Sequence, residues 1–302
     1  MLAVIKAVSP SGGDDSDVIQ AAIREVAERP VTQGVCGAVL LKPGTFKCSK
    51  PIVIAHEGVV LRGSGLGKSG TIIEMTGEPH SAIVIEGPDL SFPQQAANNS
   101  YSILDNYIPT GTSEISVQNS EGLTPGQEIH IRWSRTEDWI RFMGMDQLVR
   151  KRKGQPDIPQ TWMKAGTEVT IHRTIRSIDG NRITLDIPFT DAIDRQLQTQ
   201  PATIIKTPHL QRLAQCGVES LQIVSPPHRG TLTAGKNVSI VFRGHSEDCW
   251  VKDIVMRETL NNVQIGENCG SSQLRKRIRI TNPPSKREQV IQPIFQSGDR
   301  RC

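Results

Sequence analysis

After residue 37 the sequence breaks into apolar runs of three or four residues, each ended by glycine, proline or charged side chains. Runs this short are too brief for helices and are typical of strands that end at turns. Few of the breaks contain the Asn-Gly or Asp-Gly pairs that favour two-residue hairpins. We therefore expect stacked coils of a solenoid rather than an antiparallel meander. The runs are residues 38–41, 52–54, 59–61, 71–73 and 82–85.

The same pattern returns after residue 210. Residues 216–223 and 249–256 align at an offset of 33, and both place apolar residues three and five positions after Val218 or Val251. The next cysteine, Cys269, follows Cys249 by only 20 positions. Unequal spacing with a shared pattern indicates coils whose loops differ in length. Inward side chains of such coils stack on one another. The cysteines are therefore predicted to be small buried hydrophobic groups rather than nucleophiles or disulfide partners.

One amphipathic helix is predicted over residues 14–28. Asp14 and Asp15 can accept backbone N–H groups at its start, and Pro30 follows its end. A lone helix with a single apolar stripe needs a surface to cover. The stripe is made of Val18, Ile19, Ala22, Ile23 and Val26.

Residues 98–205 follow a different pattern. Residues 126–132 and 168–175 alternate apolar and polar side chains, and residues 177–185 indicate two strands joined by a tight turn at Asp179 and Gly180. We expect an antiparallel β subdomain inserted into the solenoid. The predicted divisions are 1–97 (capping helix and first coils), 98–205 (inserted subdomain), 206–281 (later coils) and 282–302 (irregular basic tail).

Charge and composition exclude several classes of protein. The formal net charge is +4, and the last 32 residues hold eight Lys or Arg against two acidic residues. Only Phe295 is aromatic in this tail, so a solvated terminus is favoured over nucleic-acid binding. No run approaches the roughly 20 apolar residues of a membrane span. Residues 1–8 lack the charged n-region of a signal peptide, and the cysteines lack the Cys-x-x-Cys spacing of structural zinc sites.

The N-terminal pattern resembles that of pectate-lyase-like right-handed parallel β-helix proteins. The resemblance covers residues 14–87 and, more loosely, 210–270. It implies an all-β fold in which the helix caps the open end of the first coil. It also implies relatives that are mostly exported and that bind or cleave polysaccharides, together with phage tail proteins and members without known activity. An extracellular or periplasmic location follows from the resemblance alone. The matching segments are Asp14-Asp15, 19–23, 37–46, 58–65 and 71–73.

The densest titratable cluster of the repeat region flanks residues 237–243 and 262–266, which are expected to be neighbouring strands. A lyase needs a base beside a cation that neutralises a uronate carboxylate. His245 or His228 suits the role of the base, and Arg229, Arg243 or Arg257 suits that of the cation. A hydrolase needs two facing carboxyl groups, here from Glu247, Asp248 and Glu258. Calcium is an alternative occupant of the carboxylates, although no ordered ligand spacing demands a metal. The predicted catalytic residues are Arg243, His245, Arg257 and Glu258, and the predicted substrate contacts are His228 and Arg229.

Tryptophans of the inserted segment offer a second candidate surface. Trp133 and Trp139 flank Arg135 in the sequence. Indole faces stack on sugar rings and arginine binds carboxylates in a bidentate manner, so the three residues are predicted to contact an acidic polysaccharide. The alternative is that the tryptophans form the core of the small subdomain.

Beyond Pro283 and Pro284 no further coil is readable, and no segment that would close the solenoid is evident. Three functions stay open. The first is an enzyme, favoured as a lyase over a hydrolase, that acts on an acidic polysaccharide. The second is a non-catalytic glycan-binding or surface β-helix protein, and the third is a truncated, inactive relative. The sequence does not fix the oligomeric state.

Overall fold

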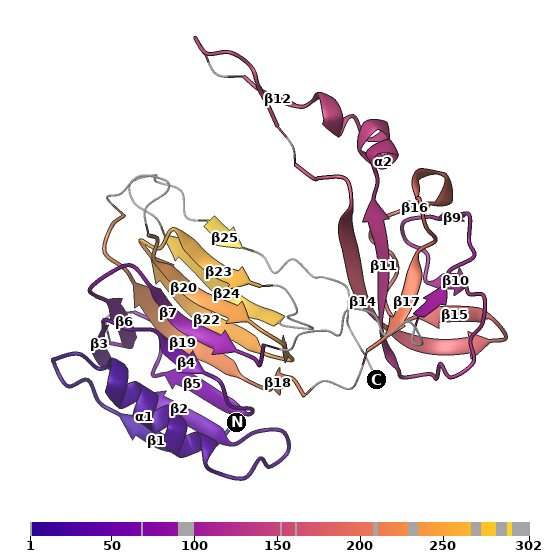
Figure 1. The fold of residues 1–302 in the computed structure, drawn as a ribbon. Coiled ribbons are helices and arrows are strands. Elements are labelled where there is room, and N and C mark those ends of the chain that lie inside the picture. The colour runs from indigo at the N-terminus through magenta and orange to yellow at the C-terminus, as the bar shows by residue number, and fades with distance from the viewer. Residues whose placement is uncertain are drawn as a thin grey trace. The chain divides into compact units, whose positions relative to one another are not determined.

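The chain forms two compact units in the computed structural model (Figure 1). Unit 1 comprises Met1–Leu90 and Gln211–Cys302, and unit 2 comprises Ser91–Leu210. The domain boundaries drawn from the sequence, at residues 97, 205 and 281, stay predictions. The structure describes residues 2–67, 69–89, 100–151, 153–160, 162–207, 211–228, 235–266, 273–281 and 289–291.

Unit 1 is a right-handed parallel β-helix whose coils each contribute strands to three faces. On the second face, β3 (Gly44–Cys48) pairs in parallel with β6 (Thr71–Met75). β6 in turn pairs in parallel with the second half of β19 (Gly217–Val224). The first face pairs β1 (Val4–Val8), β2 (Gly37–Leu41), β5 (Val59–Gly63), the first half of β19 (Gly217–Val224) and β22 (Trp250–Arg257). The third face pairs β4 (Ile52–Ile54), β7 (Ser81–Glu86), β20 (Val238–Arg243) and β23 (Asn261–Ile265).

Later strands bend from one face to the next without a break. Ser220 in β19 and Asp253 in β22 have φ angles of 55° and 52°, a left-handed conformation that turns the chain at the corner. β22 also pairs in parallel with β24 (Gln273–Thr281), and β25 (Gln289–Ile291) pairs antiparallel with β24. The short strands β18 (Leu213–Ala214) and β21 (Ser246–Glu247) pair with each other.

The predicted offset of 33 residues is confirmed by the register. Val218 pairs with Val251, and Leu221 pairs with Ile254. Both pairs point into one core that extends from β1 to the coil of β22 and β23. Stacking equivalent aliphatic side chains in successive coils removes them from water, which is the main stabilising contribution to such a fold.

The cysteines of the coils are buried and unpaired, as predicted. Cys36, Cys48, Cys216 and Cys249 carry free thiols. Burial raises the pKa of the Cys48 thiol to about 12. A hydrogen bond with the Cys249 thiol, together with burial, raises the pKa of Cys216. Neutral, inaccessible thiols are poor nucleophiles. Cys269 and Cys302 lie outside the described residues.

Helix α1 (Ser16–Ala27) packs against β1, β2, β4 and β5, the strands at the N-terminal end of the β-helix. Its buried apolar side chains are Ile19, Ala22, Ile23 and Val26. The expectation that Val18 belongs to this stripe is wrong, since Val18 is 47% exposed. Positions 19, 22, 23 and 26 follow the i, i+3, i+4, i+7 pattern, and position 18 lies about 100° round the helix from position 19.

The helix also covers an open strand edge with a side chain. The Gln20 amide group donates from Nε2 to the Val53 carbonyl oxygen at 2.9 Å, and its Oε1 accepts from the Val53 N–H at 2.8 Å. These are the two bonds that a further strand beside β4 would make.

At the helix start, hydrogen bonds from the hydroxyl groups of Ser16 and Ser49 hold the pKa of Asp14 well below its usual range.

Replacing Gln20 with leucine should destabilise unit 1 by about 1–3 kcal/mol, the range for stripping partners from partly buried polar groups. Urea denaturation followed by reactivity of the buried thiols measures the effect. Those four thiols all lie in unit 1, and unit 2 contains no cysteine. Val18→Ala, an exposed change on the same helix, should shift stability by no more than about 0.5 kcal/mol. Equal midpoints for wild type and Gln20→Leu would show that the edge needs no cover.

Unit 2 is built on a six-stranded antiparallel sheet in the order β10-β15-β14-β11-β17-β8. The predicted turn at Asp179 and Gly180 joins β14 to β15, which confirms the hairpin. The sheet strands are β8 (Ser100–Ser102), β10 (Glu114–Ser116), β11 (Glu128–Arg135), β14 (Thr167–Asp179), β15 (Arg182–Leu185) and β17 (Thr203–Lys206). Two further pairs are β9 (Tyr107–Ile108) with β16 (Ile193–Asp194) and β12 (Val149–Arg150) with β13 (Ile158–Pro159). The helices are α2 (Glu137–Phe142), η2 (Met145–Gln147) and η3 (Arg195–Leu197).

Candidate functional site

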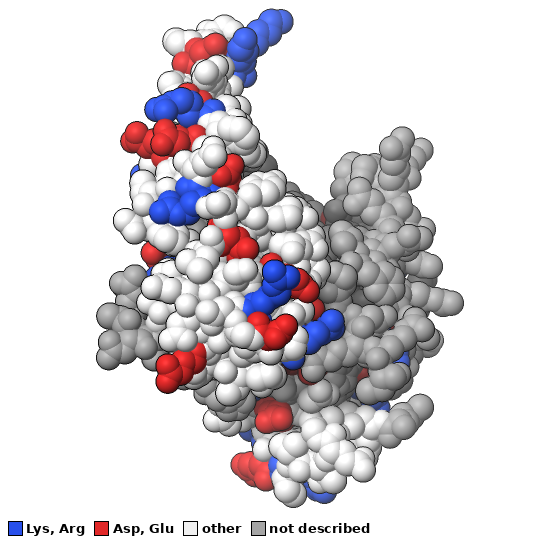
Figure 2. Space-filling model, turned by 90° about the vertical axis from the view of Figure 1, so that its right-hand side faces the viewer, with Lys and Arg blue, Asp and Glu red and all other residues white. Residues whose placement is uncertain are grey.

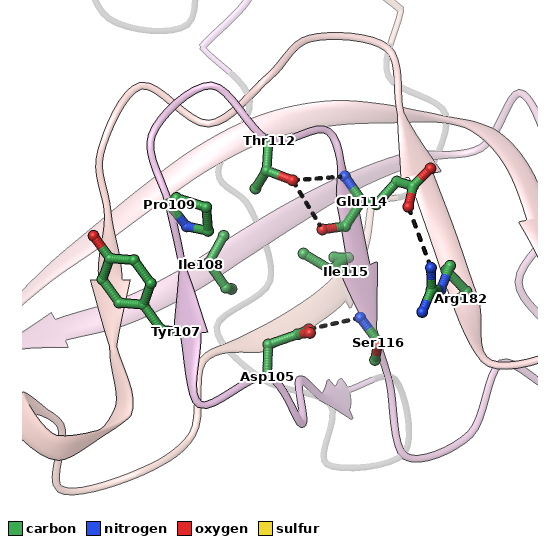
Figure 3. A pocket seen from close by; sticks show the side chains of 9 residues that line it. All are labelled: Asp105, Tyr107, Ile108, Pro109, Thr112, Glu114, Ile115, Ser116 and Arg182. Atoms are coloured by element: carbon green, nitrogen blue, oxygen red, sulfur yellow. Dashed lines mark hydrogen bonds and ion pairs between the residues drawn. The ribbon is translucent and has the colours of Figure 1, made fainter.

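Unit 2 contains a pocket with a volume of about 230 Å³, formed by β9, β10, β15 and the loops beside β9 (Figure 3). Drug-sized ligands occupy pockets of roughly 300–1,000 Å³, so this pocket suits a smaller group. Its lining residues are Asp105, Tyr107, Ile108, Pro109, Thr112, Glu114, Ile115, Ser116 and Arg182.

Strands β9 and β10 border the pocket, and each turns an isoleucine into the core of unit 2. Ile108 is 2% exposed and Ile115 is 1% exposed, and both belong to that core. Tyr107, the residue before Ile108, therefore points to the opposite side and is 58% exposed. Figure 3 shows Tyr107 and Pro109 on one side of the pocket and Arg182 on the other.

Polar groups form most of the pocket lining. The Ser116 N–H donates to Asp105 Oδ2 at 2.6 Å. Arg182 Nη1 lies 3.5 Å from Glu114 Oε2, in a pair that is largely exposed to water. The Thr112 hydroxyl accepts from the Glu114 N–H at 3.4 Å. Within the described structure, the Tyr107 hydroxyl forms no hydrogen bond. The Asp105 and Glu114 carboxylates each keep an oxygen that can accept a hydrogen bond from a ligand.

The arrangement suits a ring with one apolar face and a polar rim. Tyr107 supplies exposed aromatic surface, which favours contact with C–H groups, whereas Ile108 and Ile115 are almost fully buried. Two carboxylates and one guanidinium leave the rim with an excess of negative charge, which disfavours an anionic ligand. A neutral, polyhydroxylated ring of monosaccharide size meets both conditions.

The predicted catalytic residues of the β-helix fall at two different corners. Arg243, at the end of β20, forms an ion pair with Glu86 at the end of β7, with Nε and Oε1 2.8 Å apart. His245 is 2% exposed, and its Nδ1 lies 3.2 Å from the carbonyl oxygen of Pro88. These two residues lie together where the third face ends.

Arg257 and Glu258 lie at the corner where the third face begins. The Ser225 N–H donates to the Arg257 carbonyl oxygen at 3.1 Å, and the Ser225 hydroxyl donates to the Glu258 carbonyl oxygen at 2.8 Å. His228 is half-buried and follows Ser225 by three residues. The six residues of β20 separate this corner from Arg243 by roughly 17 Å at the rise of a strand. Arg229 lies outside the described residues. The chemical roles predicted for these residues stay predictions.

The structure brings Trp133, Arg135 and Trp139 together. The Arg135 guanidinium carbon lies 4.0 Å from the Trp139 ring centroid and 5.5 Å from that of Trp133, and its Nη2 lies 2.6 Å from Asp191 Oδ2. Trp133 is 3% exposed and Arg135 is 5% exposed. Trp133 thus belongs to the core of unit 2, one of the two alternatives that the sequence left open. The predicted substrate contacts of the three residues stay predictions.

The inserted segment is not basic as a whole. Residues 91–210 carry 13 Lys or Arg and 13 Asp or Glu. In Figure 2, acidic and basic side chains lie interspersed over the described surface that faces the viewer. The net charge of this segment therefore gives no preference for an acidic ligand.

Sequence reasoning missed the pocket altogether. Its residues belong to no repeat, and three of the polar ones lie on strands of only two or three residues. The one signal was the exposed aromatic Tyr107 next to an apolar residue and Pro109, in a segment bounded by Asp105 and Gly111. Among the residues that the structure describes, no three His, Cys, Asp or Glu side chains gather as a metal-binding group. In the same residues, no helix has the length and apolar character needed to span a membrane.

Comparison with known proteins gives structural neighbours only. No family model matches the chain, and no curated protein matches it. The Gp54 tailspike of Acinetobacter baumannii bacteriophage AP22, in complex with A. baumannii capsular saccharide, is 10% identical with a TM-score of 0.38, over 84% of this chain and 34% of that chain. The tailspike protein gp49 from Pseudomonas phage LKA1 is 13% identical with a TM-score of 0.40, over 87% of this chain and 39% of that chain. The Pseudomonas phage phi297 tailspike gp61 is 10% identical with a TM-score of 0.35, over 85% of this chain and 42% of that chain. The chain therefore spans less than half the length of each.

Proposed function

We propose that this protein binds glycans and that the pocket of unit 2 holds one neutral sugar ring. The observation that carries the proposal is the combination of an exposed tyrosine and a polar rim around a pocket of about 230 Å³. A pyranose has the matching anatomy, with C–H groups on one face and hydroxyl groups around its edge. Tyr107 stacks on that face, and Asp105 and Glu114 accept from the hydroxyl groups.

Rigid positioning supports the same conclusion. The hydrogen bond from the Ser116 N–H, at 2.6 Å, fixes the Asp105 carboxylate. Acceptors that are held in place before binding lose little conformational entropy when a ligand arrives. An extracellular or periplasmic site of action accompanies this proposal, because it places the protein beside polysaccharides.

Replacing Tyr107 with alanine should weaken binding of a neutral oligosaccharide about tenfold, the effect of losing roughly 1.4 kcal/mol of stacking and apolar contact. Tyr107→Phe should retain most of the affinity, because it keeps the ring. Trp162→Ala is the matched control: Trp162 is 74% exposed in the same unit and lies outside the pocket. Titration calorimetry with a panel of neutral oligosaccharides measures the change. Equal affinities for wild type and Tyr107→Ala across every bound member would exclude the pocket.

Polysaccharide cleavage by a lyase or a hydrolase is the second candidate. It is supported by the corner that carries exposed Arg257 and half-buried Glu258; half-buried His228 follows Ser225, which bonds to this corner, by three residues. A cation beside a base is the requirement for removing the proton next to a uronate carboxylate. Incubation with uronate polysaccharides, monitored for unsaturated products in the ultraviolet, tests the lyase. A reducing-sugar assay on the same samples tests the hydrolase, and silence in both would leave binding alone.

A further inference from the structure

Residues 137–166 of unit 2, which we call the arm, comprise α2, η2, β12 and β13 with their connecting loops. None of the side chains that the structure describes in the arm is buried. β12 pairs with β13 alone, so neither strand joins the six-stranded sheet. Figure 1 shows α2 and β12 beyond the ends of β11 and β14. An isolated pair of strands is marginally stable in water, and the arm has no core of its own that would offset the entropy lost on ordering.

Large apolar side chains are concentrated on the arm. It makes up about a tenth of the chain, yet it holds six of the fifteen large apolar side chains that are exposed among the described residues. Phe142 and Trp162 are 73% and 74% exposed. The other four are Met143, Leu148, Val149 and Ile158. A concentration of this kind marks an interaction surface rather than the scattered apolar residues of an ordinary protein exterior.

The base of the arm is tied to the rest of unit 2. The Thr136 hydroxyl donates to the Leu197 carbonyl oxygen at 2.5 Å, and the Gly166 N–H donates to the Arg135 carbonyl oxygen at 2.8 Å. The Arg135 guanidinium carbon also lies 4.0 Å from the ring centroid of Trp139, at the start of α2. The apolar side chains of the arm are therefore presented from a fixed base.

Positive charge accompanies these apolar groups. Residues 141–164 carry six Lys or Arg and two Asp, and Figure 2 shows Lys or Arg side chains at the end of the arm, at the top of the view. Arg141 is paired with Asp138, with Nη1 and Oδ1 3.0 Å apart. Four further basic side chains of the arm are exposed and form no ion pair with any residue that the structure describes. They are Arg150, Lys151, Lys153 and Lys164.

The mixture of exposed apolar groups and unpaired cations favours a lipid surface over a protein partner. Lysine is depleted in the centres of protein interfaces, where its ammonium group would lose its hydration. At the surface of a bilayer, aromatic rings occupy the interfacial layer while lysine and arginine reach the phosphates of the lipid heads. The excess of positive charge complements a surface that contains anionic lipids.

We propose that the arm binds the surface of an anionic lipid bilayer. Its apolar side chains, Phe142 and Trp162 among them, enter the interfacial layer, and its basic side chains pair with the anionic groups of the lipid heads. The arm lies on such a surface rather than across it, because α2 has only six residues where a span needs about 20. The inference goes beyond the proposed binding of a neutral sugar and uses none of the pocket residues.

Co-sedimentation of the full chain with lipid vesicles tests the proposal. Vesicles of equal parts phosphatidylcholine and phosphatidylserine should bind the protein, and vesicles of phosphatidylcholine alone should bind it at least about tenfold more weakly. Added salt should weaken binding to the anionic vesicles, because screening reduces the attraction between the basic side chains and the lipid heads. Equal binding to the two kinds of vesicle, or binding to neither, would overturn the proposal.

Variants of the arm identify the side chains that bind. Lys151→Gln combined with Lys153→Gln should weaken binding to the anionic vesicles about 25-fold, since one basic residue near an anionic surface contributes about fivefold. Trp162→Ala should weaken it about tenfold, because no indole enters the interfacial layer. Arg176→Gln and Leu104→Ala are the matched controls, since both residues are exposed in unit 2 and lie outside the arm. They should leave binding unchanged.

Acrylamide quenching of Trp162 fluorescence, taken as the difference between wild type and Trp162→Phe, shows what covers the arm. The indole should be quenched freely in the absence of vesicles and protected when anionic vesicles are added. Protection without vesicles would mean that another part of the chain or a second copy covers the arm, and would overturn the proposal. Vesicle binding that is unchanged in both arm variants would assign it to the basic residues 271–302 and would equally overturn the proposal. Failure of Tyr107→Ala to affect neutral sugars would count against the pocket alone.

Discussion

Phe242→Ala should destabilise unit 1 by about 3–5 kcal/mol, the range for removing a fully buried phenylalanine. Phe242 has no exposed surface and points into the core from β20. It pairs in register with Ile85 on β7 and with Ile265 on β23, so its ring is packed by the coil before it. Removing the ring leaves a cavity between coils whose backbones are fixed by their ladders, which limits how far the site can collapse.

Urea denaturation with thiol labelling measures this loss in unit 1 selectively. The matched control is Val241→Ala, because Val241 is the neighbour of Phe242 on the same strand but points outward and is half-buried. The control should cost no more than about 1 kcal/mol. A loss of similar size in both variants would mean that the inward and outward sides of β20 are not as described.

Gly244→Ala should also be strongly destabilising, by about 3 kcal/mol, because two costs add there. Gly244 has a φ of 69°, a left-handed conformation that is unfavourable for residues with a Cβ atom. A Cβ atom would also lie 2.2 Å from the Gly87 carbonyl oxygen, a backbone atom that cannot swing away. The two glycines let the corner after β7 and the corner after β20 touch, and the bond from the Gly87 N–H to the Arg243 carbonyl oxygen, at 2.9 Å, depends on that approach.

Gly13→Ala provides the control for Gly244→Ala. Its nearest contact would be ordinary, at 3.7 Å from the Ser11 hydroxyl oxygen, and its backbone needs no left-handed conformation. The control should change stability by about 0.5 kcal/mol or less. Thermal and urea unfolding of the two variants, compared with wild type, give the difference. A neutral Gly244→Ala would show that the two corners can separate without loss.

The sequence was most informative where one residue type recurs at equivalent positions. The register of Val218 on Val251 was predictable, because inward side chains of stacked coils repeat. The helix was predictable from its stripe, although the side chain at Val18 was misplaced because adjacent helical positions differ by 100°. The superfamily suggested by the N-terminal pattern stays a prediction.

The candidate sites were much less predictable. Arg243 and Arg257 both follow strands, but the sequence does not show which corner of a coil each strand reaches, and the structure separates the two residues along β20. The close contact of the Trp250 indole with the backbone at Gly217 was overlooked, since it depends on the glycine that precedes Trp250 by 33 residues in the neighbouring coil. When the repeats are aligned, a glycine in one repeat at the position of a large aromatic residue in the next is the signal that would have identified this contact.

The pairing of Arg62 with Glu219 spans 157 residues, because unit 2 is encoded between the second and third coils. During synthesis at 5–20 residues per second, β5 must wait roughly 8–30 s for its partner β19. Throughout that interval a hydrogen-bonding edge and an aliphatic surface on the nascent chain have no permanent cover. Early compaction of unit 2, whose contacts are mostly its own, shortens the tether between the two halves of the β-helix. Because unit 2 lies between the two segments of unit 1 in the sequence, we expect its folding to influence the rate at which the two halves of the β-helix pair.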